Sequence, residues 1–260
     1  MNAALVVDHI VQWLKDYCTA AGSKGFAVGV SGGIDSAVTS TLCARTGKTT
    51  LLLEMPIYQA PEQVALARAH IAWLEAQYPR AEGVHLDLTP AFQALEAILP
   101  PGVQDGLTMA NTRSRLRMTT LYAFAGHHRL LVAGTGNKVE DFGVGFFTKY
   151  GDGGVDLAPI ADLLKTEVYA LGKVLGVIEG ILQAPPTDGL WEDRRTDEGQ
   201  LGATYPELEW AMHFDAVGDD EGRLSDRRRE VLAIYRRFNR ANRHKTAPIP
   251  VCRIPEPLKA

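Results

Sequence analysis

A segment rich in glycine and hydroxyl groups, GVSGGIDS at residues 29–36, carries the residue types best suited to chemistry. Its paired glycines let the backbone turn sharply and approach a ligand closely. Backbone amides at the start of a helix, together with the hydroxyls of Ser31 and Ser36, form a cradle for phosphate. Asp35 would repel that phosphate unless a cation stood between them, which indicates Mg²⁺. The segment therefore predicts a Mg²⁺-assisted phosphate site.

Two other interpretations of this segment remain open. Gly29, Ser31 and Gly33 fit the GxSxG pattern that places a hydrolase nucleophile between a strand and a helix, with His244 as the late histidine. A glycine turn that binds no ligand is the second alternative. Neither accounts for Asp35 or for the charged motifs that follow, so the phosphate site is favoured.

Charged side chains recur in several later segments. NTRSRLRM (111–118) carries arginines four residues apart on a predicted helix, which fits either a solvated basic face or an anion contact. GTGNKVED (134–141) follows a predicted strand. Within the stretch 146–166, four charged residues cluster around a glycine-rich turn, namely Lys149, Asp152, Asp156 and Lys165. A turn without function would not need this concentration of charge.

The elements that must position these residues alternate along the chain. We predict strands at 26–30, 50–55, 84–88 and 130–134, and helices at 2–21, 34–46, 61–77, 89–99, 109–127, 162–175 and 225–245. The opening helix places Leu5, Val6, Ile10, Trp13, Leu14 and Tyr17 on one apolar stripe. Short apolar strands separated by helices predict an α/β fold with a doubly wound parallel sheet flanked by helices. Ligands in such a sheet bind at the carboxyl ends of the strands.

Composition narrows the class of protein further. The 260 residues are 46% hydrophobic and 22% charged with a net charge of −4, which suits one domain over residues 1–260 and no general affinity for nucleic acid. The opening residues lack a signal-peptide pattern, and no apolar run is long enough to span a membrane. Three widely spaced cysteines form no CxxC, which favours a reducing cytoplasm. Residues 183–204, rich in Pro, Gly and charge, predict an exposed loop.

The motifs together resemble a known family. SGGIDS resembles the pyrophosphate-binding loop of ATP pyrophosphatases, a Rossmann-like group that includes NAD, GMP and asparagine synthetases and tRNA-thiolating enzymes. Residues 146–166 closely resemble the FFTKxGDGGxD…P…L.K block of ammonia-dependent NAD synthetases. Residues 111–118 resemble that family's NxKARxRM helix, and residues 184–190 its P-[ST]-xxL segment. The resemblance spans about residues 10–245 and is weakest at 56–62, where no adenine-contacting residues can be assigned.

The resemblance implies a role for each candidate residue. The implied ATP-binding residues are Gly29, Val30, Ser31, Gly32, Gly33, Ile34, Asp35, Ser36, Thr135, Lys165 and Thr187. The implied deamido-NAD-binding residues are Arg115, Lys149, Asp156, His244 and Lys245. Asp35 and Glu140 are the implied Mg²⁺ ligands, although the spacing from Glu140 to Lys149 leaves Asp141 as an alternative. Lys165 would offset charge on phosphate, and Asp152 or Asp156 would deprotonate ammonium.

The resemblance also implies a reaction, in which ATP adenylates deamido-NAD and ammonia then converts it to NAD, releasing AMP and pyrophosphate. The implied cofactor is Mg²⁺ with ATP as co-substrate, and the implied assembly is a homodimer. Two other classes remain possible. A nucleotide-binding module without catalysis would share the glycine cradle, and a tRNA-thiolating enzyme would use the basic helix 225–245, which carries eight Lys and Arg against two acidic residues.

Overall fold

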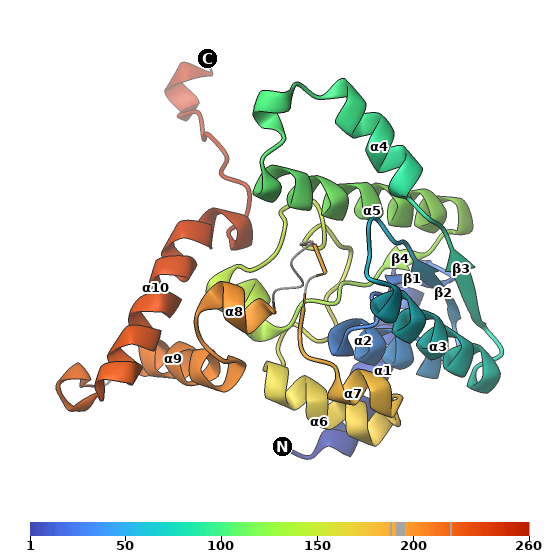
Figure 1. Ribbon diagram of the computed structural model, residues 1–260, viewed down its shortest axis with the longest axis horizontal. Coiled ribbons are helices and arrows are strands. Elements are labelled where there is room, and N and C mark those ends of the chain that lie inside the picture. Colours follow the sequence, from blue (N-terminus) through green and yellow to red (C-terminus); the bar gives the residue numbers. More distant parts are fainter. Residues whose placement is uncertain (188, 191–195, 219, 260) are drawn as a thin grey trace.

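The computed structural model describes residues 1–187, 189–190, 196–218 and 220–259. Four parallel strands form its sheet in the order β3-β2-β1-β4 (Figure 1). The strands are β1 (Gly25–Gly29), β2 (Thr49–Glu54), β3 (Ala81–His85) and β4 (Leu131–Val132). The chain moves outward from β1 through β2 to β3 and then returns to place β4 on the other side of β1. The predicted doubly wound parallel sheet is confirmed.

Helices make up most of the remaining described chain. The α-helices are α1 (Ala3–Ala20), α2 (Ile34–Arg45), α3 (Pro61–Gln77), α4 (Thr89–Ile98), α5 (Gly106–His128), α6 (Lys165–Leu175), α7 (Glu179–Gln183), α8 (Asp197–Leu201), α9 (Tyr205–Val217) and α10 (Asp226–Thr246). A π-helical segment, η2 (Val139–Val144), follows β4. Short 3-10 turns are η1 (Pro101–Val103), η3 (Glu221–Arg223) and η4 (Glu256–Leu258).

Each face of the sheet is buried by its own set of helices. Phe26 and Val28 of β1 pack with α1, α2 and α6, and Leu52 of β2 packs with α3 on the same side. Ala27 and Leu51 point to the opposite face and pack with α4 and α5. Successive strand residues alternate between the two faces, which is why these strands are apolar along their whole length. Figure 1 shows α5 above the sheet and α1, α2 and α6 below it.

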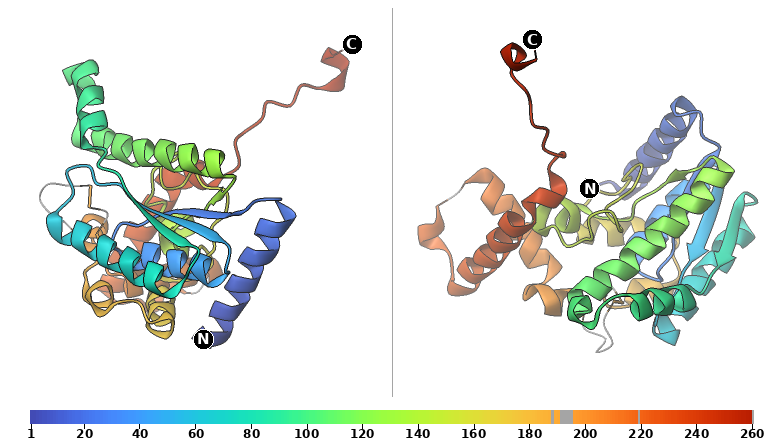
Figure 2. Two further views of the ribbon diagram at one scale, coloured as in Figure 1. Left: turned by 90° about the vertical axis from the view of Figure 1, so that its right-hand side faces the viewer. Right: turned by 90° about the horizontal axis from the view of Figure 1, so that it is seen from above.

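A further apolar cluster lies beside the sheet, between η2, α8, α9 and α10. Val139 and Val144 of η2 contribute to it, together with Tyr205 of α9 and Tyr235 of α10. This cluster holds α9 and α10 against the segment that follows β4. The chain after α10 runs away from the body in every view (Figures 1 and 2). Among the described residues, no helix is long and apolar enough to cross a membrane.

Several predicted boundaries are wrong, and the structure gives the reasons. The strand predicted at 84–88 is β3 at 81–85, because its parallel pairing with β2 begins at Ala81 opposite Thr50 and ends at His85 opposite Glu54, the last residue of β2. The helix predicted from 162 begins at Lys165, where Glu167 accepts the Leu164 amide at 2.9 Å in a capping arrangement. The strand predicted at 130–134 contains only Leu131 and Val132.

The predicted apolar stripe of the first helix is also wrong in part. α1 buries Val7, Ile10, Val11, Leu14 and Cys18, a set that repeats every three to four residues. Leu5, Trp13 and Tyr17 are instead exposed, at 65%, 39% and 42%. Both stripes are apolar, so periodicity alone could not tell which of them faces α2 and α6.

Candidate functional site

The loop after β1 turns sharply into α2, and its backbone is built for close contact. Gly32 has a φ of 86°, and a Cβ atom there would lie 2.7 Å from the carbonyl oxygen of Gln63. Only glycine fits this position. Ser31 and Ser36 close the loop, since their hydroxyls lie 3.1 Å apart and the Ser31 amide donates to Ser36 Oγ at 3.2 Å. α2 starts after Gly33 without a side-chain cap, so its first backbone amides are available to bind an anion.

Asp35 and Glu140 converge on one ammonium group. Lys165 Nζ donates to Asp35 Oδ2 at 2.5 Å and to Glu140 Oε1 at 3.0 Å, and the Lys165 side chain is only 4% exposed. The three residues come from the start of α2, from η2 and from the start of α6. Asn137 Nδ2 donates to the second oxygen of Asp35 at 3.2 Å, and the Tyr205 hydroxyl donates to Glu140 Oε1. Two carboxylates therefore meet at the carboxyl edge of the sheet, between the loops that follow β1 and β4.

The charges in this cluster stabilise one another. Burial disfavours the Lys165 ammonium, but Asp35 and Glu140 outweigh that effect and raise the pKa of Lys165 above its ordinary value. Burial, with Glu140, Asp152 and Asp35 nearby, raises the pKa of Asp141 to about 8. Two carboxylates therefore share one buried ammonium, and a bound cation would lower the pKa of the acidic groups around it.

The donor set fits Mg²⁺ held jointly with a nucleotide. Asp35 and Glu140 offer carboxylate oxygens that already surround a cationic group, and Mg²⁺ is commonly bound by one or two carboxylates together with phosphates and water. Among the described residues, no group of three or more His, Cys, Asp or Glu side chains could hold a metal without help. Asp141 packs against Gly136, where a Cβ would lie 2.2 Å from either of its carboxylate oxygens. Glu140 and Asp141 are the two candidates for the second metal ligand. Glu140 is favoured, because its side chain and that of Asp35 both bind the Lys165 ammonium.

Asp152 is held from both ends by Ser114 of α5. The Ser114 hydroxyl donates to Asp152 Oδ1 at 2.6 Å and accepts the Asp152 amide at 2.9 Å. The Thr148 amide donates to the same carboxylate oxygen at 3.0 Å. Burial is the main influence on this carboxyl and raises its pKa, while the hydrogen bonds from Ser114 and Thr148 oppose that effect.

A cavity of about 1160 Å³ joins these features. Its wall includes Lys165 and the metal-ligand candidates. Asp152 and the segment 184–187 also line it. The predicted site residues that line it are Gly29, Val30, Ser31, Gly32, Gly33, Ile34, Asp35, Ser36, Thr135, Glu140, Asp152, Lys165, Thr187 and Lys245. Every predicted ATP-binding residue is thus brought to one cavity, at the sheet edge where the topology places ligands.

Four of the predicted deamido-NAD residues lie outside the part of the cavity wall that the structure describes. Three of them form a chain of contacts, because Arg115 Nε donates to the Lys149 carbonyl at 3.2 Å and Lys149 Nζ to the His244 carbonyl at 2.8 Å. The fourth, Asp156, accepts the Val132 amide at 2.8 Å and the Tyr122 hydroxyl at 3.0 Å. Both oxygens of Asp156 therefore serve the fold in this structure.

Lys245 does line the cavity, but its ammonium is engaged with backbone. Its Nζ donates to the carbonyls of Gly145 and Phe147 at 2.9 and 2.8 Å. Thr187 accepts the Gly189 amide at 3.1 Å. The loop predicted at 183–204 includes α8, and its residues 188 and 191–195 lie outside the described part of the chain.

Several residues of this site carry no signal in the sequence that would single them out. Asn137 and Tyr205 hold the two carboxylates, and Tyr205 also lies 3.3 Å from the buried Asp197. Gln59 accepts from Arg117 Nη2 at 2.8 Å and donates to the Gly189 carbonyl at 3.2 Å, which ties the loop after β2 to the segment near Thr187. A buried tyrosine three residues after the glycine that caps α8 carries no motif, so only the tertiary structure reveals its role.

The serine hydrolase interpretation is not supported by the geometry. Ser31 Oγ contacts Ser36 Oγ and the Gly33 amide, whereas the His244 ring is oriented toward the Ala241 carbonyl of its own helix. The histidine is exposed on α10, away from the described cavity wall. The loop and the histidine therefore do not form a nucleophile and base pair.

Comparisons with known proteins identify the family of the chain. The family model described as NAD synthase matches residues 6–248. The chain is 38% identical over 253 residues to the NH(3)-dependent NAD(+) synthetase of Carboxydothermus hydrogenoformans, covering 96% of this chain and 95% of the relative.

Two solved structures share the fold over nearly the whole chain. One is an NMN synthetase from Francisella tularensis, with a TM-score of 0.85 and 31% identity, covering 98% of this chain and 100% of that one. The other, an NH3-dependent NAD synthetase from Campylobacter jejuni with a TM-score of 0.80, covers 97% and 100%, and at 23% identity it bears on the fold alone.

Proposed function

The chain belongs to the NAD synthase family, and we propose that it uses ATP to join ammonia to the nicotinate carboxylate of deamido-NAD, forming NAD. One observation carries this proposal beyond family membership. The glycine loop, two carboxylates and a buried lysine face one cavity at the carboxyl edge of the sheet. That combination suits pyrophosphate release from ATP and leaves room for a second substrate.

The proposed reaction has two steps that balance. A carboxylate oxygen of deamido-NAD attacks the α-phosphorus of ATP, and the bond to the β-phosphate oxygen breaks, so that pyrophosphate leaves. Ammonia then attacks the acyl carbon, loses a proton to a base, and expels AMP together with the oxygen that joined it to the acyl group. Activation is needed because hydroxide is a poor leaving group at neutral pH.

The residues of the site divide these tasks. The amides that open α2, with the Ser31 and Ser36 hydroxyls, would hold the departing pyrophosphate. Asp35 and Glu140 would hold Mg²⁺, which when bound neutralises charge on the phosphates. Lys165 would then turn from the carboxylates toward a phosphate oxygen, because its carboxylate partners would be shared with the metal. Positioning and charge neutralisation account for most of the catalysis in this scheme.

Asp152 is the proposed base for ammonium. It lines the cavity, and burial raises the pKa of its carboxyl, which brings it closer to the range useful for proton transfer. Asp156, the other residue considered for this role, has both oxygens engaged with Val132 and Tyr122. Asp152 is therefore the better candidate.

A second candidate substrate is the mononucleotide that corresponds to half of deamido-NAD. The structural relative of 31% identity is an NMN synthetase, and four residues assigned to deamido-NAD by resemblance lie outside the described cavity wall. Amidation of nicotinate mononucleotide would require the cavity to hold only the nicotinate half of deamido-NAD. The ratio of kcat/KM for the two substrates distinguishes these functions, and a ratio above about ten in favour of deamido-NAD assigns the dinucleotide.

We further propose that the chain works in the cytoplasm as a homodimer, with residues 1–260 acting as one domain. Cys18 and Cys43 are buried and reduced, and Cys252 is exposed, which suits a reducing compartment. Sedimentation equilibrium of the purified chain tests the assembly. A molecular mass of about twice 28.3 kDa is expected.

The test of the main proposal is product analysis with the purified chain. Deamido-NAD, ATP, Mg²⁺ and an ammonium salt should give NAD and AMP in equal amounts, whereas glutamine freed of ammonia should support little turnover. Release of ADP in place of AMP, or efficient use of glutamine, would count against it.

A further inference from the structure

We propose that Asn239 and Asn242 of α10 are positioning residues for Glu140, and that they act through the backbone of η2. The proposal rests on the proposed function, in which Glu140 is a Mg²⁺ ligand. It assigns a task to two residues of α10 for which neither the charge pattern nor the family resemblance implies a role.

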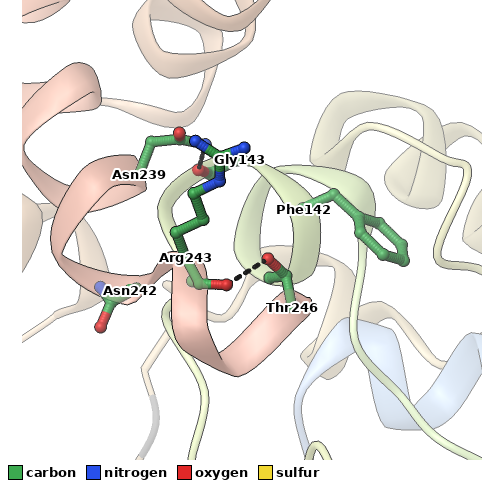
Figure 3. A pocket seen from close by; sticks show the side chains of 7 residues that line it. Phe142, Gly143, Asn239, Asn242, Arg243 and Thr246 are labelled. Carbon is green, nitrogen blue, oxygen red and sulfur yellow. Dashed lines mark hydrogen bonds between the residues drawn. The ribbon is translucent and has the colours of Figure 1, made fainter. Parts of the chain in front are cut away.

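Three side chains of α10 donate to three successive carbonyls at the end of η2. Asn239 Nδ2 lies 2.7 Å from the carbonyl oxygen of residue 143, Asn242 Nδ2 lies 2.9 Å from that of residue 144, and Lys245 Nζ lies 2.9 Å from that of residue 145. Their spacing of three residues places them on one face of the helix. A carbonyl can only accept, so each asparagine must present its amide nitrogen. Figure 3 shows Asn239 directed at Gly143.

These carbonyls need external donors because a helix leaves its last carbonyls without intrahelical partners. Residues 143–145 are also buried, and a buried carbonyl without a donor costs about 1–3 kcal/mol. Gly145 ends η2 with a φ of 64°, and a Cβ there would lie 2.4 Å from Asn242 Cβ. α10 is thus pressed against the turn that closes η2.

The same turn is tied directly to Glu140. The amides of Gly145 and Phe146 both donate to the Glu140 carbonyl, the latter at 2.9 Å. The Glu140 side chain, at the other end, accepts from Lys165 and Tyr205. A shift of the 143–146 turn would therefore move the Glu140 backbone relative to Asp35, which α2 holds independently.

Packing against Val144 covers one side of this end of η2, but it leaves a gap beside the asparagine hydrogen bonds. A pocket of about 290 Å³ opens beside them, lined by Phe142, Arg243 and Thr246 among others (Figure 3). Phe142 is 55% exposed, so it does not fill the space between η2 and α10. The amide bonds are the specific contacts that fix the turn, which is the arrangement expected of residues that orient a metal ligand.

The experiment compares Asn239→Ala and Asn242→Ala with the wild-type chain and with Arg240→Ala, an exposed position on the same helix. Mn²⁺ binding is followed by electron paramagnetic resonance in the presence of a non-hydrolysable ATP analogue, because the site is proposed to hold the metal jointly with a nucleotide. Amide hydrogen exchange is followed over residues 139–147. Each asparagine variant should raise the dissociation constant for Mn²⁺ roughly tenfold, within the 10- to 100-fold range typical of groups that orient metal ligands. Exchange at Gly145 and Phe146 should accelerate, and Arg240→Ala should match the wild type.

The outcomes separate this inference from the proposed metal site. If Glu140→Gln weakens Mn²⁺ binding and the asparagine variants do not, the positioning role is wrong and the metal site stands. If Glu140→Gln binds Mn²⁺ as the wild type does, both proposals fail. A lower Tm in the asparagine variants with unchanged Mn²⁺ affinity shows a merely structural role and overturns the inference.

Discussion

Lys165 Nζ lies 3.0 Å from Glu140 Oε1 while it also donates to Asp35, so one buried ammonium joins two carboxylates that are 105 residues apart in the chain. The bridge crosses the point where the sheet topology reverses, between the loops after β1 and β4. It shows how the proposed metal ligands are kept close together by the protein alone. The proposed chemistry depends on this convergence.

Asp35→Asn should lower kcat by roughly a hundredfold or more while the fold is retained, because the change removes a charge aimed at the proposed Mg²⁺ site but keeps the side-chain shape. Steady-state kinetics at saturating Mg²⁺ measures the effect. Asp162→Asn is the matched control, since the Asp162 side chain is 96% exposed and pairs only with Lys138 among the ion pairs of the described chain. Near-normal turnover of Asp35→Asn would contradict the metal role.

Lys165→Met should lower the stability of the free protein by about 3–5 kcal/mol, because two buried carboxylates are left without their cation. Mg²⁺ should then stabilise this variant more than it stabilises the wild type, since the metal would occupy a site of greater negative charge. Thermal unfolding with and without millimolar Mg²⁺ measures both effects. An equal Mg²⁺-dependent rise in Tm for the two proteins would argue that the metal binds elsewhere.

Asp156→Asn should reduce stability by about 1–3 kcal/mol, because an amide cannot accept at both positions where Asp156 now receives the Val132 amide and the Tyr122 hydroxyl. The KM for deamido-NAD should change little, in contrast to the binding role that resemblance implies. Tyr122→Phe should reproduce part of the loss of stability. A large rise in KM with an unchanged Tm would restore the binding role.

Stability should fall as the pH drops from about 6.5 to 4, partly because of His70. This ring is fully buried in α3 and lies 3.0 Å from Ser40 Oγ, and burial lowers its pKa from 6.5 to about 4. Between these values the unfolded chain binds the proton and the folded chain does not, so stability present above pH 6.5 is lost toward pH 4. The contribution is up to about 3 kcal/mol. Urea unfolding of His70→Gln across this range should give a flatter profile than the wild type, and parallel profiles would exclude His70.

The sequence predicts the parallel sheet and the phosphate loop because their signals are local. Alternating apolar runs identify β1 and β2, and Gly32 must be glycine where the loop passes Gln63. Strand ends are less predictable, since β3 ends with its neighbour β2, where His85 lies opposite Glu54, and not where its own apolar pattern stops.

The contacts of the site depend on residues far apart in the chain. Nothing near Glu140 indicates that Tyr205 holds it, and nothing near Asp156 indicates that both its oxygens are used by β4 and α5. Motif resemblance proposes which residues belong to the site. It does not say which of them are free to meet a ligand, because that depends on tertiary contacts.

The most direct test of the central claim follows an oxygen atom. Deamido-NAD labelled with ¹⁸O in its nicotinate carboxylate is converted by the purified chain with ATP, Mg²⁺ and ammonium, and the products are analysed by mass spectrometry. An adenylated intermediate predicts that AMP carries one ¹⁸O and that pyrophosphate carries none, because the carboxylate oxygen that attacks the α-phosphorus leaves with AMP. AMP without label, or label in pyrophosphate, would contradict the account.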